Sequence, residues 1–161
     1  MNEYKLKNKW TLWYHSLKDN NWLISSYNNL LQMNDLYDYQ LLEDSFQQNH
    51  YQNGMFFLMK NNIKPIWEDP KNRMGGCLSF KISQKNILNT WNFLIKKCIC
   101  ENIFMNHYNI NGISISPKKE FNIIKIWFMD DINKKSPNYK VDFILNPYLA
   151  IHKSIYNKHI E

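Results

Sequence analysis

The stretch NIIKIWFM, residues 122–129, indicates how this chain folds. Every second residue from position 124 to position 128 is apolar, whereas the residues between them include Lys125 and Trp127. Successive side chains of a strand point to opposite faces, so this period of two predicts a strand with one face on the core. Solvent exposure explains the lysine on the opposite face but explains the tryptophan poorly. We therefore expect the second face to serve a ligand.

Outward from this stretch, alternation and short apolar runs predict further strands. We expect them at 9–15, 55–59, 77–82 and 110–116, with strand-like or extended segments at 139–145 and 149–156. Two segments instead have apolar residues at helical spacing: 36–48, with Asn34 and Asp35 as N-cap candidates, and a helix that Ser83 caps and that runs to Cys98. Long runs of strands with two amphipathic helices predict an α+β fold, in which an antiparallel β-sheet packs its helices on one face.

The length and composition predict one folded domain. The 161 residues suffice for one sizeable core but not for two ordinary domains, and no repeat or linker divides them, so we expect a single domain over 1–161. The aromatic content of 16% exceeds the needs of such a core, which suggests that some rings contact a ligand. The net charge of +6 favours an anionic partner without naming one.

Other features argue against a membrane, a metal or a cofactor. The sequence has no apolar stretch of the ~18 residues that a membrane span needs, and residues 1–21 lack the apolar core of a signal peptide, so we expect the cytosol or nucleus. The odd count of cysteines suits reduced thiols. Cys98 and Cys100 with His107 suggest zinc only weakly, because a fourth ligand at sensible spacing is missing.

Two tryptophans stand in stretches that are typical of loops. In KPIWED, residues 64–69, Pro65 fixes its own backbone angle and favours an extended residue before it, so Trp67 is expected on a loop. Trp22 follows a polar run at 18–21 and precedes a strand. Two exposed indoles on separate loops could hold a planar ring between them, but each could equally cap an edge of the core.

Guanine methylated at N7 would suit such a pair of indoles. Its delocalised positive charge is attracted to indole faces by roughly 0.5–2 kcal/mol per contact. Glu68 could accept hydrogen bonds from the N1–H and the exocyclic amine in a bidentate fork, although loop glutamates are usually only solvated. Asp69 is expected to be solvated or to hold the turn.

Three lysines are candidates for the phosphates of this ligand. Lys118 and Lys119 follow Pro117 in a loop, and Lys125 shares a strand face with Trp127. Lysines act as point charges, so they would add affinity and salt dependence rather than specificity. Each of these lysines, taken alone, could equally be a solvated surface residue.

Three segments resemble translation initiation factor 4E, the protein that binds the 7-methylguanosine cap of messenger RNA: LKNKWTLWY (6–14), IKPIWEDPKNRMGG (63–76) and ISISPKKEFNIIKIW (113–127). The most specific motif is Pro-x-Trp-Glu-Asp followed by Gly-Gly. The resemblance implies a curved sheet with helices on its convex face and the cap in its concave face. It also implies a cytoplasmic, non-enzymatic cap-binding domain whose base-stacking residues are Trp22 and Trp67, with Glu68 at the guanine edge, Trp127 at the N7 methyl group and Lys118 at the phosphates.

The chain departs from the family pattern at several positions. Cys77-Leu78 replaces the usual Arg-Trp after Gly-Gly, which removes one cation near the phosphates. The second basic phosphate position aligns with Ile123, and Lys125 on the same strand face could substitute. A short loop at 130–138 stands where the family has a long helix.

The convex face is expected to bind a scaffold protein of the initiation factor 4G type, or a dedicated substitute, with altered contacts. Gln40 occupies the position of the family's partner-binding tryptophan, beside Tyr39. A dedicated partner could use Leu36, Tyr39 and Phe93, because helix-in-groove docking needs only a few apolar anchors.

Two other functional classes stay open. An enzyme acting on caps or nucleotides is disfavoured because the sequence has no acid cluster for a metal pair, no oriented Cys–His pair and no Walker-type loop. A protein-interaction domain that has lost cap binding is disfavoured because Trp22, Trp67 and Glu68 occur together. Within the cap-binding class, the sequence does not separate an initiation factor from a translational repressor.

Overall fold

The computed structural model describes residues 3–106 and 110–160. Within these residues, seven strands and four helices follow one another: β1 Lys5–His15, β2 Asn28–Asp35, α1 Leu36–Ser45, α2 Gln48–Asn53, β3 Met55–Lys60, β4 Gly76–Ser83, α3 Ile87–Ile99, β5 Ile110–Pro117, β6 Phe121–Phe128, α4 Val141–Ile144 and β7 Ile155–Lys158. Single 3-10 turns lie at Ile24–Ser26, Gln84–Asn86 and Ile151–Lys153.

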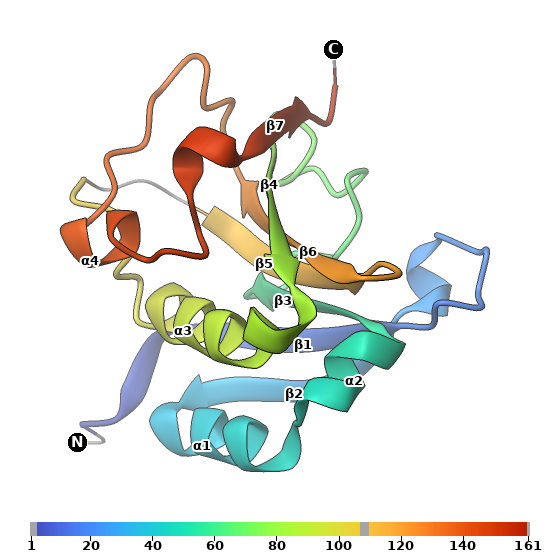
Figure 1. Cartoon of the computed structure of the whole chain (residues 1–161). Coiled ribbons are helices and arrows are strands. Elements are labelled where there is room, and N and C mark those ends of the chain that lie inside the picture. The colour runs from blue at the N-terminus through green and yellow to red at the C-terminus, as the bar shows by residue number, and fades with distance from the viewer. Residues whose placement is uncertain (1–2, 107–109, 161) are drawn as a thin grey trace.

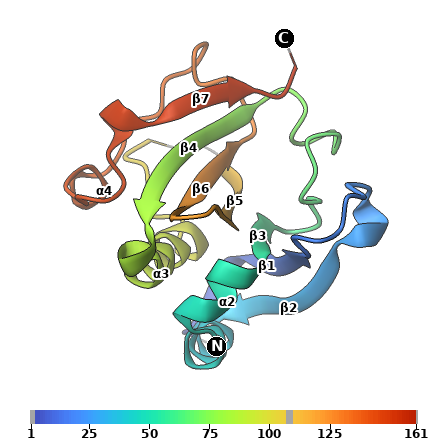
Figure 2. The same cartoon turned by 45° about the vertical axis from the view of Figure 1, so that its right-hand side comes forward.

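The strands form one antiparallel sheet in the order β2-β1-β3-β5-β6-β4-β7. The sheet is curved, and α1, α2 and α3 lie on its outer side (Figure 1). Figure 2 shows the opposite, concave side of the sheet, where the loop between β1 and β2 approaches the loop between β3 and β4. The expected α+β fold, with a curved antiparallel sheet and helices on one face, is confirmed.

The alternation in β6 has the predicted consequence. Ile124, Ile126 and Phe128 are completely buried in the main core, which lies between the sheet and the helices. Trp127 on the opposite face is 7% exposed and belongs to a second, smaller apolar cluster with Phe57, Met59, Ile63 and Cys77. The concave face therefore has a packed apolar floor of its own.

The two predicted helices are present, with changes at their ends. Asp35 caps α1, because its side chain accepts a hydrogen bond from the backbone N–H of Asp38, as the N-cap prediction required. The helix ends at Ser45 rather than near 48, and the separate helix α2 follows, which the sequence reading did not resolve. Ser83 makes no capping hydrogen bond, since a 3-10 turn intervenes before α3.

The prediction of a strand-like segment at 139–145 was wrong. Apolar residues alternate at 141, 143 and 145, but the segment contains the short helix α4, which buries only Phe143 in the core. Val141 and Leu145 are 66% and 72% exposed, so the alternation does not mark two faces of a strand. The last extended segment is confirmed in part, as β7 at the outer edge of β4.

Within residues 3–106 and 110–160, no helix combines the length and the apolar character that a membrane span requires.

Candidate ligand site on the concave face

The loop between β3 and β4, residues 61–75, is held in shape by two of its own side chains. The carboxylate of Asp69 accepts hydrogen bonds from the backbone N–H groups of Lys64, at 2.8 Å, and Lys71, at 2.9 Å. Asn72 is completely buried, and its amide donates to the carbonyl oxygens of Lys64, at 2.9 Å, and Ile66, at 2.8 Å. Asp69 thus holds the turn, which was one of its two expected roles.

A residue from a distant strand completes this support. Asn111 on β5 donates from its side-chain amide to Asn72 Oδ1 at 2.9 Å and to the carbonyl oxygen of Lys71 at 2.8 Å. The segment that presents Trp67 and Glu68 is therefore attached to the sheet by buried amide hydrogen bonds, which are costly to leave unmade.

The loop between β1 and β2, residues 16–27, is built mainly from local turns. Side-chain oxygens of Asp19 and Asn21 accept hydrogen bonds from backbone N–H groups two residues further on, which is a common device in polar loops. The hydroxyl of Ser26 lies 2.6 Å from the carbonyl oxygen of Asn21, and His15 Nε2 lies 2.8 Å from the same oxygen. A carbonyl only accepts, so Nε2 of His15 carries a proton and donates it.

His15 also supports the indole of Trp22 directly. The two rings stack with centroids 4.1 Å apart and planes 8° from parallel. His15 is completely buried at the end of β1, whereas Trp22 is 51% exposed. One face of the indole is therefore covered by the imidazole, and the rest of the ring remains available to a ligand.

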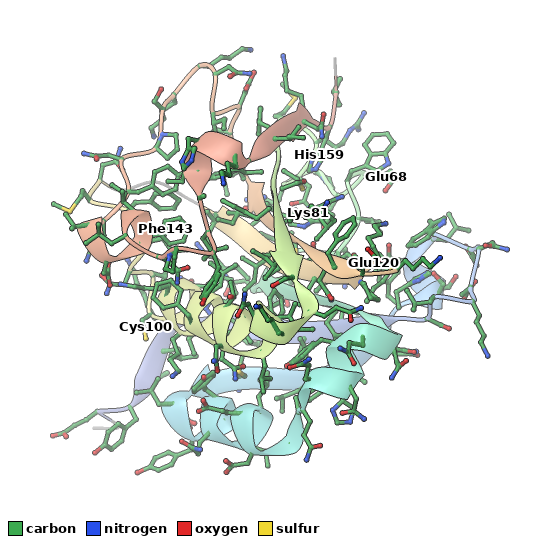
Figure 3. The ribbon with its side chains drawn as sticks, viewed as in Figure 1. Glu68, Lys81, Cys100, Glu120, Phe143 and His159 are labelled. Atoms are coloured by element: carbon green, nitrogen blue, oxygen red, sulfur yellow. The ribbon has the colours of Figure 1, made fainter. Side chains whose placement is uncertain are left out.

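The two loops meet at a pocket of about 400 Å³. Trp22 and Glu68, from separate loops, both line it, together with Leu23, Ile24, Ser25 and Ile66. Figure 3 marks Glu68 beyond the sheet, on the side of these loops. Trp67 is 48% exposed and is not among the lining residues. The structure thus brings together one predicted stacking residue and the predicted edge-reading acid, and leaves the second indole outside.

Electrostatics also connect the two loops. Tyr27 closes the first loop, and its pKa is raised to about 12, first by burial and then by the negative charge of Glu68. The carboxylate of Glu68 therefore lies close enough to the first loop for its charge to affect the ionisation of Tyr27.

Trp127 forms part of the floor behind these loops. Its indole N–H donates to Ser114 Oγ at 3.0 Å, and Phe57 packs edge-on against it with centroids 6.2 Å apart. With 7% exposure, it presents only a small surface on the concave side.

The three predicted phosphate-binding lysines lie at two places on the β5–β6 hairpin. Lys118 and Lys119 are exposed in its turn, which the backbone hydrogen bond from Lys118 N–H to the Phe121 carbonyl closes at 2.7 Å. Lys125 lies on the concave face, where it pairs with Ser79 of β4 and Ser114 of β5. Burial raises the pKa of the nearby Cys77, and the positive charge of Lys125 lowers it to a smaller extent. Of the three lysines, Lys125 is therefore the one that lies on the floor of the concave face.

The cysteines lie in different parts of the molecule. Cys77 is buried on β4, Cys98 is buried on α3 and Cys100 is exposed just after α3. Among the residues that the structure describes, no three cysteine, histidine or acidic side chains group as metal ligands, and His107 lies outside those residues.

The predicted partner surface on the convex side is only partly exposed. Leu36 is 39% exposed and Gln40 is exposed, whereas Tyr39 is 7% exposed and packs in the main core. Phe93 is half-buried against the core. The more exposed apolar residues of α1 are instead Tyr37 and Leu41, at 65% and 57%. Sequence spacing could not separate these from Tyr39, because the apolar residues of α1 surround much of the helix.

A family model for eukaryotic initiation factor 4E matches residues 5–160. The chain belongs to this family. A Drosophila melanogaster member, eukaryotic translation initiation factor 4E1, is 27% identical over 145 residues, which cover 83% of this chain and 53% of the relative. A 4E homolog of Acanthamoeba polyphaga mimivirus is 31% identical over 64 residues, 38% of this chain and 24% of the homolog. The chain thus spans about half the length of the Drosophila relative.

Solved structures of other initiation factor 4E proteins share the fold. C. elegans eIF4E-3, solved with the 4E-binding protein Mextli, has a TM-score of 0.78 at 21% identity, over 97% of this chain and 93% of that one. Ascaris suum eIF4E-3, solved with an m2,2,7G cap, has a TM-score of 0.71 at 20% identity, over 81% of this chain and 76% of that one.

The residues that sequence reasoning missed are polar residues that support the two loops: His15, Asn72 and Asn111. His15 lies in the predicted strand on the face opposite the core, and that placement was the only signal of its role. The two asparagines are inconspicuous in a sequence rich in asparagine.

Proposed function

We propose that this chain binds the 7-methylguanosine cap of messenger RNA and acts, without catalysis, in cytoplasmic translation initiation. The observation that carries the proposal is the shared pocket of Trp22 and Glu68, two residues far apart in the sequence. Membership of the initiation factor 4E family supports it, as does the likeness in fold to a 4E protein solved with a cap.

The base would be bound by stacking and by its edge. Trp22, held from behind by His15, offers an indole surface to the positively charged methylated ring, at roughly 0.5–2 kcal/mol. Glu68 accepts hydrogen bonds from N1–H and the exocyclic amine of guanine. Trp67 completes the sandwich by turning its exposed ring over the pocket when the base enters, and Trp127 meets the methyl group from the floor.

The phosphates would extend over the basic residues of the β5–β6 hairpin. Lys125 provides a positive charge on the floor, and Lys118 and Lys119 provide two more from the turn. As flexible point charges, they contribute affinity that falls as salt rises.

On the convex side, we propose a scaffold of the initiation factor 4G type or a dedicated substitute. C. elegans eIF4E-3 was solved with a 4E-binding protein, which supports a protein partner for this fold. Of the predicted anchors, Leu36 and Gln40 on α1 and Phe93 on α3 reach the surface, whereas Tyr39 packs in the core.

Titration with 7-methyl-GTP and with GTP, followed by tryptophan fluorescence, tests the proposal. We expect strong quenching by the methylated nucleotide only, because only it carries the ring charge that indoles attract. Trp67→Ala should abolish most of the response, whereas Tyr37→Ala, which removes an exposed ring from the convex side, should not change it. Equal responses to both nucleotides, or full binding by Trp67→Ala, would overturn the proposal.

The role of the lysines is tested by the salt dependence of binding. Lys118→Ala should weaken binding and reduce the slope of log affinity against log salt, whereas Lys134→Ala, in the loop after β6, should leave both unchanged. Hydrolysis of the nucleotide during the titration would instead indicate an enzyme.

A further inference from the structure

His159, just after β7, fastens the end of the chain to the 61–75 loop. Its backbone N–H donates to the carbonyl oxygen of Gly75 at 3.0 Å, and its Nδ1 lies 2.7 Å from the carbonyl oxygen of Asn72. The preceding residue, Lys158, pairs with Gly76 at the first position of β4. We call His159 and these two attachments to the loop the His159 latch.

The hydrogen-bond partners of the ring define its protonation state. The carbonyl of Asn72 can only accept, so Nδ1 carries the proton of the neutral ring. Nε2, which then has a free lone pair, lies 3.3 Å from Cys77 Sγ. Burial raises the pKa of Cys77 to about 12, so this group is a thiol whose S–H can donate to Nε2. Both ring nitrogens are therefore satisfied when the imidazole is neutral.

The latch also contacts the proposed ligand site. The imidazole packs against the indole of Trp127, with centroids 5.3 Å apart and planes at 55°. Asn72, whose carbonyl the ring binds, is the residue that holds the carbonyl of Ile66 in the pocket wall. Figure 3 shows His159 and Glu68 on the same side of the molecule.

We propose that neutral His159 is a positioning residue for the concave site, which holds the 61–75 loop and Trp127 in the arrangement that binds ligand, and that its protonation releases the latch. The ligand part of this statement rests on the proposed cap binding. In the protonated ring, Nε2–H would face a buried thiol, which is a weak acceptor.

The charges around the ring determine the direction of the effect. Burial lowers the pKa of His159 below its usual value near 6.5, the hydrogen bond to Asn72 and the charge of Glu68 raise it, and the charge of Lys125 on β6 lowers it. Cys77 on β4 is neutral. Lys158, on β7, is itself paired with Asp131 at 3.3 Å.

The sign follows from proton linkage. Since the pKa is lowered in the folded state, the unfolded or released histidine takes up its proton first as the pH falls. The latch is fully stable above about pH 6.5 and weakens as the pH falls from there toward the lowered pKa.

A direct test needs no ligand. Nitrogen NMR of the imidazole should show the proton on Nδ1 at neutral pH and a pKa below 6.5. On acidification, the amides of residues 72–77 should lose protection, measured as their exchange rates relative to the intrinsic rate at each pH. A proton on Nε2, or protection factors that do not change through the titration, would overturn the latch even in a protein that binds no nucleotide.

The ligand test compares pH profiles of 7-methyl-GTP affinity. His159→Ala should weaken binding about tenfold at pH 7.5, because all ring contacts are lost. His159→Asn keeps a donor at the place of Nδ1, so it should recover part of this affinity. Dividing the parent profile by that of His159→Asn removes the titration of the nucleotide itself, and the ratio should fall severalfold below about pH 6.5.

His152→Ala is the matched control, since His152 is an exposed histidine shortly before β7, and it should follow the parent at every pH. Parallel profiles of the parent and His159→Asn would overturn the positioning role. Failure of the parent to bind 7-methyl-GTP would instead overturn the proposed function, and the latch would be judged by the ring NMR and hydrogen exchange alone.

Discussion

The two loops that carry the predicted stacking residues are supported in different ways. The 16–27 loop is held by its own turns and by His15, which immediately precedes it. The 61–75 loop is also held by distant residues, Asn111 on β5 and His159 at the end of the chain. One loop depends on local sequence and the other on the completed fold.

The difference determines what each loop can contribute to binding. In the first loop, the support reaches the indole itself, because Trp22 is stacked on His15. In the second loop, the support reaches the backbone, and Trp67 remains 48% exposed outside the pocket. In the proposed cap complex, Trp22 is thus preorganised, whereas Trp67 loses side-chain freedom on binding.

The largest effect is expected from Asn72→Ala, which removes the centre of the long-range support. The substitution leaves the carbonyl groups of Lys64 and Ile66 and the amide of Asn111 without this partner. At about 1–3 kcal/mol for each buried group left unsatisfied, we expect the free energy of unfolding to fall by about 3 kcal/mol. Urea denaturation measures it.

Asn62→Ala serves as the control for this variant. Asn62 lies in the same loop but is exposed, and its side chain accepts one hydrogen bond, from Lys9. We expect a change within about 0.5 kcal/mol. Equal effects of the two substitutions would mean that the loop does not depend on its buried amides.

His15→Ala should have a smaller effect, confined to the first loop. It removes the ring behind Trp22 and the hydrogen bond to Asn21, so 7-methyl-GTP affinity should fall about tenfold. His15→Phe keeps a ring for stacking and should retain most of the affinity. Fluorescence titration well below the unfolding temperature provides both values.

The same variant tests whether the loops are independent. Hydrogen exchange at Asn72 and Gly75 should be unchanged in His15→Ala, because the contacts of those residues come from elsewhere. Faster exchange there would contradict the contrast between local and long-range support.

The sheet is largely predictable from the sequence because its strands alternate between two environments. The apolar residues of β6 at 124, 126 and 128 enter the core, and Trp127 enters the opposite cluster, as the period of two requires. Asp35 signals the start of α1 because a short acidic side chain can cap a helix locally. Both signals extend over only a few neighbouring residues, so they can be recognised in a single sequence.

The rest depends on contacts between distant residues, which leave no local pattern. Nothing near Asn72 indicates that Asn111 and His159 will bind it. The segment at 139–145 was predicted to be strand-like or extended, but it contains α4, a helix of which only Phe143 is buried in the core. The position of Trp67 outside the pocket also lies beyond sequence reasoning, because a side-chain orientation on a loop is determined by its neighbours in space.

The smallest expected effect concerns an electrostatic contact between the two loops. The pKa of Tyr27 is raised to about 12, mainly by burial and then by Glu68. In Glu68→Gln, this pKa should fall but stay above its ordinary value of about 10, because burial remains. The Cζ resonance of Tyr27, followed by carbon NMR in alkaline solution, measures it.

The linked stability has a definite sign. A phenol with a raised folded-state pKa makes folding less favourable as the pH rises above about 10, because the unfolded chain releases its proton first. Glu68→Gln should reduce this alkaline loss slightly, whereas Glu120→Gln, in the exposed β5–β6 turn, should not alter it. An unchanged Tyr27 pKa in Glu68→Gln would mean that the carboxylate does not act across the pocket. The two loops would then line one pocket without an electrostatic interaction between them.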